Sequence, residues 1–328
     1  MTFPLNGAYV TYPFDVKPPY ADQWNVSLQR QLGAAWMVSA NYLASRGHRL
    51  PLGDQLNPAV FGAGATTANT AARRQLTLEN PAEGRFYANI YELKPIGTSE
   101  YNALFLSAQH RAVKGLFLSG NYTLSKCISD LVDYVVANGQ VDLVKPGDPS
   151  YDRGSCGSTD QRHVVNLSAV YQVPGTSSGV MGMLTRDWQI STIVSARSGI
   201  HFNALTGVDN ALSGAANQRP DLAGDPYAKK GNQWLDPAAF RSPVAGTYGN
   251  LEANALVAPN WFNVDLGLVR SFRIAGEQQV QFRLEAFNVL NRVQLGVPVA
   301  LLNAPNFGTI TSTAGDARIF QLALKYVF

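Results

Sequence analysis

The sequence predicts an all-β fold in which about nine long antiparallel strands form a segment of a transmembrane β-barrel. One reason is composition, because charged residues make up 15% of the chain and hydrophobic residues 46%, whereas an average soluble domain has roughly 25% charged residues. A second reason is that no run approaches about 18 consecutive apolar residues, so no transmembrane helix is expected. A third is the alternation of apolar and polar residues along most of the chain. A β-barrel is then the only structure that could cross a membrane.

The C-terminal residues, Asp316 to Phe328, alternate most regularly. One face of this predicted strand would carry Phe320, Leu322, Leu324, Tyr326 and Phe328, and the other Ile319, Gln321, Ala323, Lys325 and Val327. This ending resembles the C-terminal signal strand of bacterial outer-membrane β-barrel proteins, which is read during barrel assembly. The resemblance implies that Tyr326 and Phe328 belong to an assembly signal. The alternative is a terminal strand docked in a soluble sheet.

Taken in order, residues 1–21 are rich in Pro, Tyr and Gly and are expected to form an N-terminal loop segment, while residues 22–328 hold the barrel strands. Alternation predicts strands over residues 22–31, 36–42, 102–112, 116–125, 162–173, 188–196, 262–268, 279–286 and 316–328. The apolar faces of the first eight are formed by Trp24, Val26 and Leu28; Trp36, Val38, Ala40 and Tyr42; Leu104, Leu106 and Ala108; Leu118, Tyr122 and Leu124; Val165, Leu167, Ala169 and Tyr171; Trp188, Ile190, Thr192, Val194 and Ala196; Phe262, Val264, Leu266 and Leu268; and Val280, Phe282, Leu284 and Ala286.

The connections between these strands alternate strictly between short and long. Short ones lie at 32–34, 114–115, 174–186 and 274–277, and long ones at 45–99, 126–161, 198–259 and 291–315. Transmembrane barrels show this pattern because periplasmic turns are tight and extracellular loops are elaborated. Long irregular loops also count against an ordinary soluble sandwich.

Aromatic residues sort by depth in this orientation, as expected for belts at the two membrane interfaces. The outer ends of the strands carry Trp24, Tyr42, Tyr122, Phe262 and Phe320, and the periplasmic ends carry Trp36, Tyr171, Trp188, Tyr326 and Phe328. The polar face would line the barrel lumen. On it we expect Arg30, Asn263, Gln279, Gln281, Arg283, Glu285 and Lys325.

Several segments resemble the C-terminal half of TonB-dependent outer-membrane transporters, and in particular the Oar-like subgroup, whose members carry a carboxypeptidase-regulatory-like domain. The segments are 19–32 (PYADQWNVSLQRQL), 101–126 (YNALFLSAQHR and KGLFLSGNYTLSK), 160–163 (DQRH), and FNVDLGLVRSFRI with the following FRLEAFNVLNR. Nothing in the chain resembles the plug domain of that family. The N-terminus has no secretory signal pattern, so we expect this chain to be the C-terminal part of a longer protein.

The resemblance implies location in the outer membrane of a Gram-negative bacterium and energy-coupled uptake of a bulky solute. It implies contact with outer-membrane lipid and with the barrel-assembly machinery. In the intact protein it also implies a plug domain, the TonB energy-coupling complex and a solute that the sequence does not identify. The net charge of +3 gives no indication of a nucleic-acid partner. The alternative function is that of a non-transporting surface protein, either an adhesin or a structural barrel.

Few residues indicate a chemical site. Cys127 and Cys156 bracket one outer loop and are expected to form a disulfide in an oxidising compartment, the alternative being two free thiols. In Thr206–Leu222 most of the oxygen ligands of a Ca²⁺ loop are missing after Asp209. The four histidines are scattered, and His163 has no triad-like partner, so the stretch 160–163 is expected to tie a loop to a strand. We therefore expect no enzyme activity, no metal and no cofactor.

Overall fold

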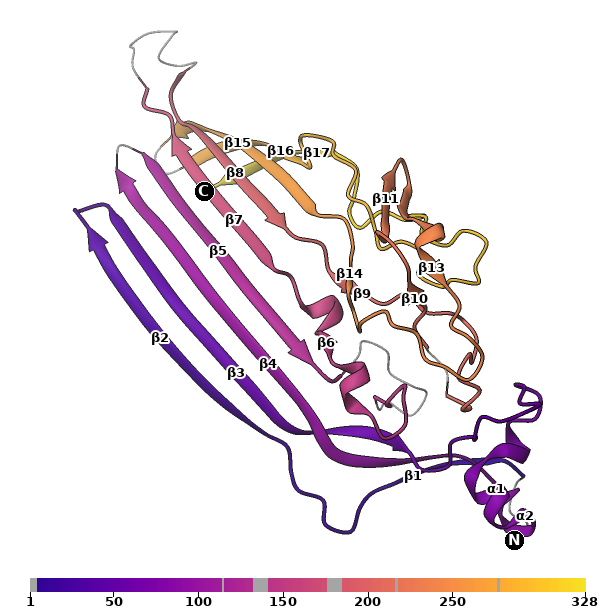
Figure 1. The fold of residues 1–328 in the computed structure, drawn as a ribbon. Coiled ribbons are helices and arrows are strands. Elements are labelled where there is room, and N and C mark those ends of the chain that lie inside the picture. Colours follow the sequence, from indigo (N-terminus) through magenta and orange to yellow (C-terminus); the bar gives the residue numbers. More distant parts are fainter. Residues whose placement is uncertain (1–4, 114, 132–140, 176–184, 216–217, 276–277) are drawn as a thin grey trace.

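The computed structural model describes residues 5–113, 115–131, 141–175, 185–215, 218–275 and 278–328. Its main feature is an 11-stranded sheet in which nine long strands follow one another in chain order from edge to edge (Figure 1). Neighbours along this path are antiparallel. They are β2 (Tyr20–Leu32), β3 (Trp36–Gln55), β4 (Tyr87–Val113), β5 (Leu116–Ser129), β7 (His163–Gln172), β8 (Trp188–Arg197), β15 (Trp261–Ala275), β16 (Gln278–Phe287) and β17 (Ile319–Val327). The nine predicted strands are confirmed.

The register brings the apolar residues of neighbouring strands together on one face of the sheet. One row, from β2 to β15, consists of Leu28, Ala40, Leu106, Tyr122, Val165, Ala196 and Phe262. Another, from β5 to β17, consists of Leu116, Tyr171, Ile190, Leu268, Leu284 and Leu322. This face is open rather than covered, since Leu28 is 71% and Leu324 74% exposed. An apolar face of this extent is suited to lipid.

The prediction for Arg30 is wrong. Arg30 pairs with Val38 and therefore lies on the apolar face, in the same alternate series as Val26 and Leu28. It lies near the end of β2 that leads into the short turn. A long arginine side chain at a strand end can extend its guanidinium to the interface, so this position is physically acceptable.

Two segments expected to be loops contain strand. β3 continues to Gln55 and β4 begins at Tyr87, and these extensions pair with each other, with register shifts between Gly47 and Pro51. Within residues 1–21, β1 (Gly7–Thr11) pairs in parallel with Tyr87–Glu92 of β4, so the prediction of a loop there is wrong. Apolar alternation does not mark these pairs, because strand segments beyond the bilayer need no lipid-facing side.

The two ends of the sheet differ in their connections (Figure 1). We call 56–86, 130–162, 198–260 and 288–318 the outer loops; the short connections lie at the opposite end. The outer loops contain α1 (Gln75–Glu79), α2 (Pro81–Gly84), short 3₁₀ turns at Ala71–Arg73, Pro149–Asp152, Gly157–Thr159 and Pro237–Ala239, and the short strands β6 (Gly154–Ser155), β9 (His201–Phe202), β10 (Asp221–Leu222), β11 (Tyr227–Lys230), β12 (Gln233–Leu235), β13 (Phe240–Arg241) and β14 (Leu256–Val257). Among the described residues, no helix is long and apolar enough to span a membrane.

The main hydrophobic cluster of buried residues lies in the outer loops rather than under the sheet. It consists of Phe202, Ala204, Leu235, Ala239, Phe240, Leu251, Leu256, Ala258 and Phe307. Phe240 and Phe307 pack edge to face with ring centroids 5.1 Å apart, which joins the third and fourth outer loops. These loops therefore form a packed body next to the strand ends.

Candidate functional site in the outer loops and on the polar face

A disulfide connects the end of β5 to the second outer loop. Cys127 and Cys156 are bonded, with their Cα atoms 5.3 Å apart, and the Cys156 amide donates to the Cys127 carbonyl at 3.3 Å. The bridge closes a segment with a sequence separation of 29. A bridge of that span constrains the unfolded loop by about 3 to 4 kcal/mol in the chain-entropy model. It holds β6, which directly precedes Cys156, beside the end of β5.

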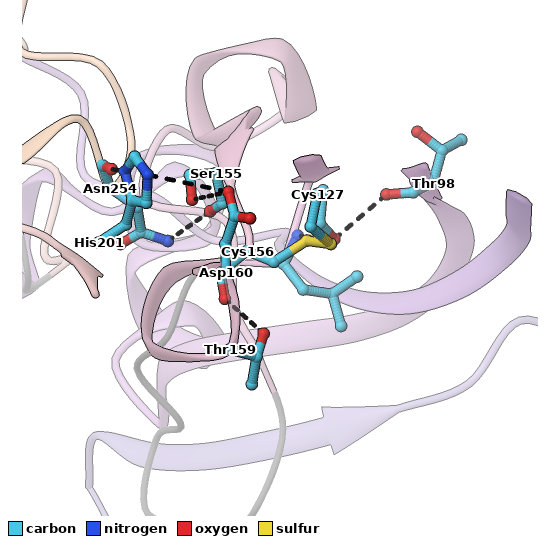
Figure 2. The surroundings of a disulfide bond; sticks show 10 residues. Thr98, Cys127, Ser155, Cys156, Thr159, Asp160, His201 and Asn254 are labelled. Atoms are coloured by element: carbon cyan, nitrogen blue, oxygen red, sulfur yellow. Dashed lines mark hydrogen bonds and ion pairs between the residues drawn. A yellow bond between two sulfur atoms is a disulfide. The ribbon is translucent and has the colours of Figure 1, made fainter. Parts of the chain in front are cut away.

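Next to the disulfide, four polar residues join the second outer loop to the third (Figure 2). The Ser155 hydroxyl donates to Asp160 Oδ2 at 2.9 Å, and His201 Nε2 lies 3.8 Å from the same oxygen. His201 Nδ1 and the Asn254 carbonyl are 3.0 Å apart, and Asn254 Nδ2 donates to the Ser155 carbonyl at 2.8 Å. Ser155 donates to the carboxylate and not to the imidazole, so the order of contacts differs from that of a catalytic triad.

The stretch 160–163 ties a loop to the beginning of β7, as the sequence predicts. Arg162 donates to the Ser125 carbonyl at 3.2 Å, and the His163 amide donates to Ser198 Oγ at 3.0 Å. His163 Nδ1 also lies 2.8 Å from the Tyr122 hydroxyl. These contacts connect β5, β7 and the end of β8. Of the other two histidines, His48 stacks on Tyr20 and His110 packs edge to face with Trp36.

A buried ion pair links the second and third outer loops. Arg219 Nη1 donates to Asp152 Oδ1 at 2.8 Å, and both side chains are 0% exposed. Arg219 also donates to the Leu251 carbonyl at 2.9 Å and to the Tyr151 carbonyl, and its guanidinium stacks on the Tyr151 ring at 4.0 Å. Burial raises the pKa of Asp152, and the neighbouring Arg219 acts in the opposite direction. Almost every polar atom of the two side chains is satisfied by a hydrogen bond.

A hollow of about 310 Å³ lies where the first, third and fourth outer loops meet. It is lined by Thr67, Leu205, Gly207, Val208, Asp209, Gly214, Ala215 and Leu301. Asp209 Oδ2 accepts from the Gly214 amide at 2.7 Å, and Asp209 Oδ1 accepts from Gln218 Nε2 at 2.6 Å. This carboxylate therefore shapes its own loop. Among the described residues, no group of three or more His, Cys, Asp or Glu is placed to hold a metal ion.

The face of the sheet opposite the apolar one carries a continuous polar row, beside apolar residues such as Phe105 and Ile193. One row, from β2 to β15, consists of Gln29, Ser39, Ser107, Asn121, Asn166, Ser195 and Asn263. Its members bond to one another: the Ser39 and Ser107 hydroxyls are 2.7 Å apart, and Asn166 bonds both Asn121 at 3.2 Å and Ser195 at 3.3 Å. On the same face, Glu285 pairs with Gln321 and Gln281 with Lys325. A hydroxyl and amide surface of this kind suits a water-filled lumen.

The predicted signal residues lie at the end of β17. Tyr326 pairs with Val280 of β16, and its ring stacks on that of Phe328 with centroids 5.9 Å apart. Phe328 is 91% exposed. Both therefore present aromatic surface near the short-connection end of the sheet, and their role in assembly stays a prediction.

The sequence reasoning missed Asp152 and Arg219, for which no local motif exists.

The apolar and polar faces of the sheet agree with what a comparison of the sequence with known protein families found. A model described as "Outer membrane beta barrel domain" matches residues 1–321. The chain belongs to this family. As an outer-membrane β-barrel domain, it places its apolar face in the lipid of the outer membrane.

Solved structures show a similar fold. The outer membrane transporter YddB from Escherichia coli superposes with a TM-score of 0.51 at 12% identity, over 96% of this barrel domain and 33% of YddB. The ferric-catecholate import receptor Fiu from E. coli K12 gives a TM-score of 0.47 at 12% identity, over 96% of this chain and 29% of Fiu. The barrel domain thus spans about a third of YddB's length. No curated protein matches the chain.

Proposed function

We propose that this barrel domain is the C-terminal part of an Oar-like, TonB-dependent transporter that takes up a bulky solute. The polar face would line the solute path and contact a plug domain, and the outer loops would capture the solute. Energy would come from the TonB complex, and the barrel-assembly machinery would recognise Tyr326 and Phe328. No catalytic step is assigned to any residue.

The observation that carries the proposal is the separation of the two faces of one continuous sheet. Lipid-facing rows of Leu, Val and aromatic residues lie opposite a row of Ser, Asn and Gln that crosses from β2 to β15. The main path of the sheet ends at β2 on one side and at β17 on the other. Further strands added between these edges would enclose the polar face as a lumen. The fold shared with part of YddB is consistent with a wall of this kind.

Uptake by intact cells tests the proposal. Cells with the gene, without it, and with the gene but without TonB would be given ferric chelates, oligosaccharides and peptides. We expect at least one solute whose uptake requires both the gene and TonB. Loss of surface adhesion without any change in uptake would instead indicate the non-transporting surface protein.

Two variants relate that result to the polar face. Asn166→Trp would project a large side chain into the proposed path, and Leu167→Phe would project one into lipid from the neighbouring position. We expect Asn166→Trp to lower uptake and Leu167→Phe to leave it unchanged at equal protein levels. Equal uptake by both variants would contradict a solute path along this face.

A further inference from the structure

Two segments that each carry an arginine, Arg292 and Arg318, meet at the turn that follows β16. The Arg318 amide donates to Asn291 Oδ1 at 3.3 Å, and Arg318 Nη1 donates to the Val289 carbonyl at 3.3 Å. The Arg292 amide donates to Asn288 Oδ1 at 3.0 Å. The buried Asn288 amide group in turn donates to the carbonyls of Arg292, at 2.9 Å, and Asp316, at 3.0 Å. Asn288 therefore holds both arginine-bearing segments together.

Each guanidinium lies over an aromatic ring at the outer end of the lipid-facing surface. Arg292 Cζ is 5.6 Å from the centroid of Phe262, and Arg318 Cζ is 5.5 Å from that of Phe320. Phe262 belongs to the apolar row with Ala196, and Phe320 pairs with Ala286 on the same face. Cation–π attraction holds both guanidinium groups at the depth of the outer aromatic belt.

The positive charge of these two arginines is uncompensated. Both are exposed, and in the described parts of the chain no carboxylate, including that of nearby Asp316, lies within ion-pair distance of either guanidinium. At the other edge of the sheet, exposed Arg49 lies over the Tyr20 ring at 5.2 Å, but carboxylates accompany the basic residues around it. There Arg46 is paired in register with Asp22 and Glu100, and His48 lies 3.3 Å from Asp22. The β15–β17 side therefore presents two exposed guanidinium groups that have no ion-pair partner among the described residues.

We propose that Arg292 and Arg318 bind the phosphate groups of a phosphorylated lipid headgroup in the outer leaflet. A planar guanidinium donates two parallel hydrogen bonds to a phosphate, and basic groups next to a lipid-facing surface attract anionic headgroups. The acyl chains would lie along Phe262 and Phe320, with the exposed Leu290 (58%) and Val293 (65%) nearby. The inference rests on the outer-membrane location and is independent of the transport proposal.

Native mass spectrometry of the intact protein in detergent micelles tests this site, with diphosphorylated lipid A and its dephosphorylated form as probes. We expect the phosphorylated form to bind at least about tenfold more tightly, because hydrogen bonds to charged groups each contribute that much or more. This comparison needs no variant. Equal binding of the two forms would overturn the proposal.

Variants assign the binding to the two arginines. Arg292→Gln with Arg318→Gln should remove the preference for the phosphorylated lipid. Arg241→Gln with Lys230→Gln removes the same charge from exposed outer-loop positions and should leave the preference unchanged. Arg292→Lys with Arg318→Lys should give an intermediate affinity, because lysine keeps the charge and loses the paired hydrogen bonds. Undiminished preference in the double Gln variant, or equal loss in the control, would overturn the proposal.

Discussion

Removing the counterion of Arg219 should loosen the outer loops without disturbing the strands. In Asp152→Asn the amide oxygen can still accept from the Val144 amide, which donates to Asp152 Oδ2 at 2.7 Å. The guanidinium of Arg219, however, would remain 0% exposed with no carboxylate partner. Leaving one charge of a buried pair uncompensated costs about 3 to 5 kcal/mol. At about 1.4 kcal/mol per factor of ten, local opening should become on the order of a hundred- to several-thousand-fold more frequent.

Hydrogen exchange measured by mass spectrometry would detect this change in peptides covering 141–153 and 218–222. Peptides from β7 and β8 should keep their protection, because their backbone hydrogen bonds lie in the sheet. Arg219→Met should have a similar effect, and the double variant should cost less than the sum of the two single changes. Arg241→Gln, on an exposed residue of the same outer loop, is the matched control. Unchanged exchange in Asp152→Asn would refute the assignment of this pair as the connection between the loops.

Three further changes test other parts of the structure. Leu322→Arg places a charge in lipid and should lower the free energy of unfolding by roughly 2 to 4 kcal/mol, as measured by urea unfolding in detergent. Gln321→Arg lies on the opposite face and should lower it far less. Equal losses would contradict the assigned faces. Replacing both disulfide cysteines with serine should make the second outer loop protease-sensitive while the strands stay folded, because about 3 to 4 kcal/mol of loop constraint is lost. Unchanged cleavage would contradict the role of the disulfide in constraining this loop. Hydrogen bonds from Lys145 and Ser150 lower the pKa of Asp148 to about 2, so its stabilising contribution should be lost as the pH falls from about 4 to 2. An NMR titration of labelled aspartate with a midpoint near 4 would contradict this.

The transmembrane part of the fold could be predicted because lipid imposes a local rule. A strand that has lipid on one side and water on the other must alternate, and this period-two pattern is visible in any short window, as in residues 165–171. The arrangement of the strands could also be predicted, because short and long connections alternate along the chain. Arg30 was misplaced although its parity with Leu28 was available in the sequence, because a charged residue was assumed to face the lumen.

The outer loops follow no such rule. Arg219 and Asp152 are separated by 67 positions, and the Cys127–Cys156 bond was suggested by two cysteines that bracket one loop in an oxidising compartment. β1 and the extensions of β3 and β4 are held by backbone pairing that needs no apolar pattern. Likewise, the segments that carry Arg292 and Arg318 are joined by hydrogen bonds from the Asn288 side chain, which no local pattern predicts.

The sequence alone therefore determined where the strands lie and, apart from Arg30, which way their side chains face, because those properties arise from the contact of each short segment with lipid or water. Tertiary structure alone decided how the loops pack, which charges are buried and which cations are left unpaired at the membrane surface. Those properties depend on contacts between segments that are distant in the chain, and no local pattern encodes them.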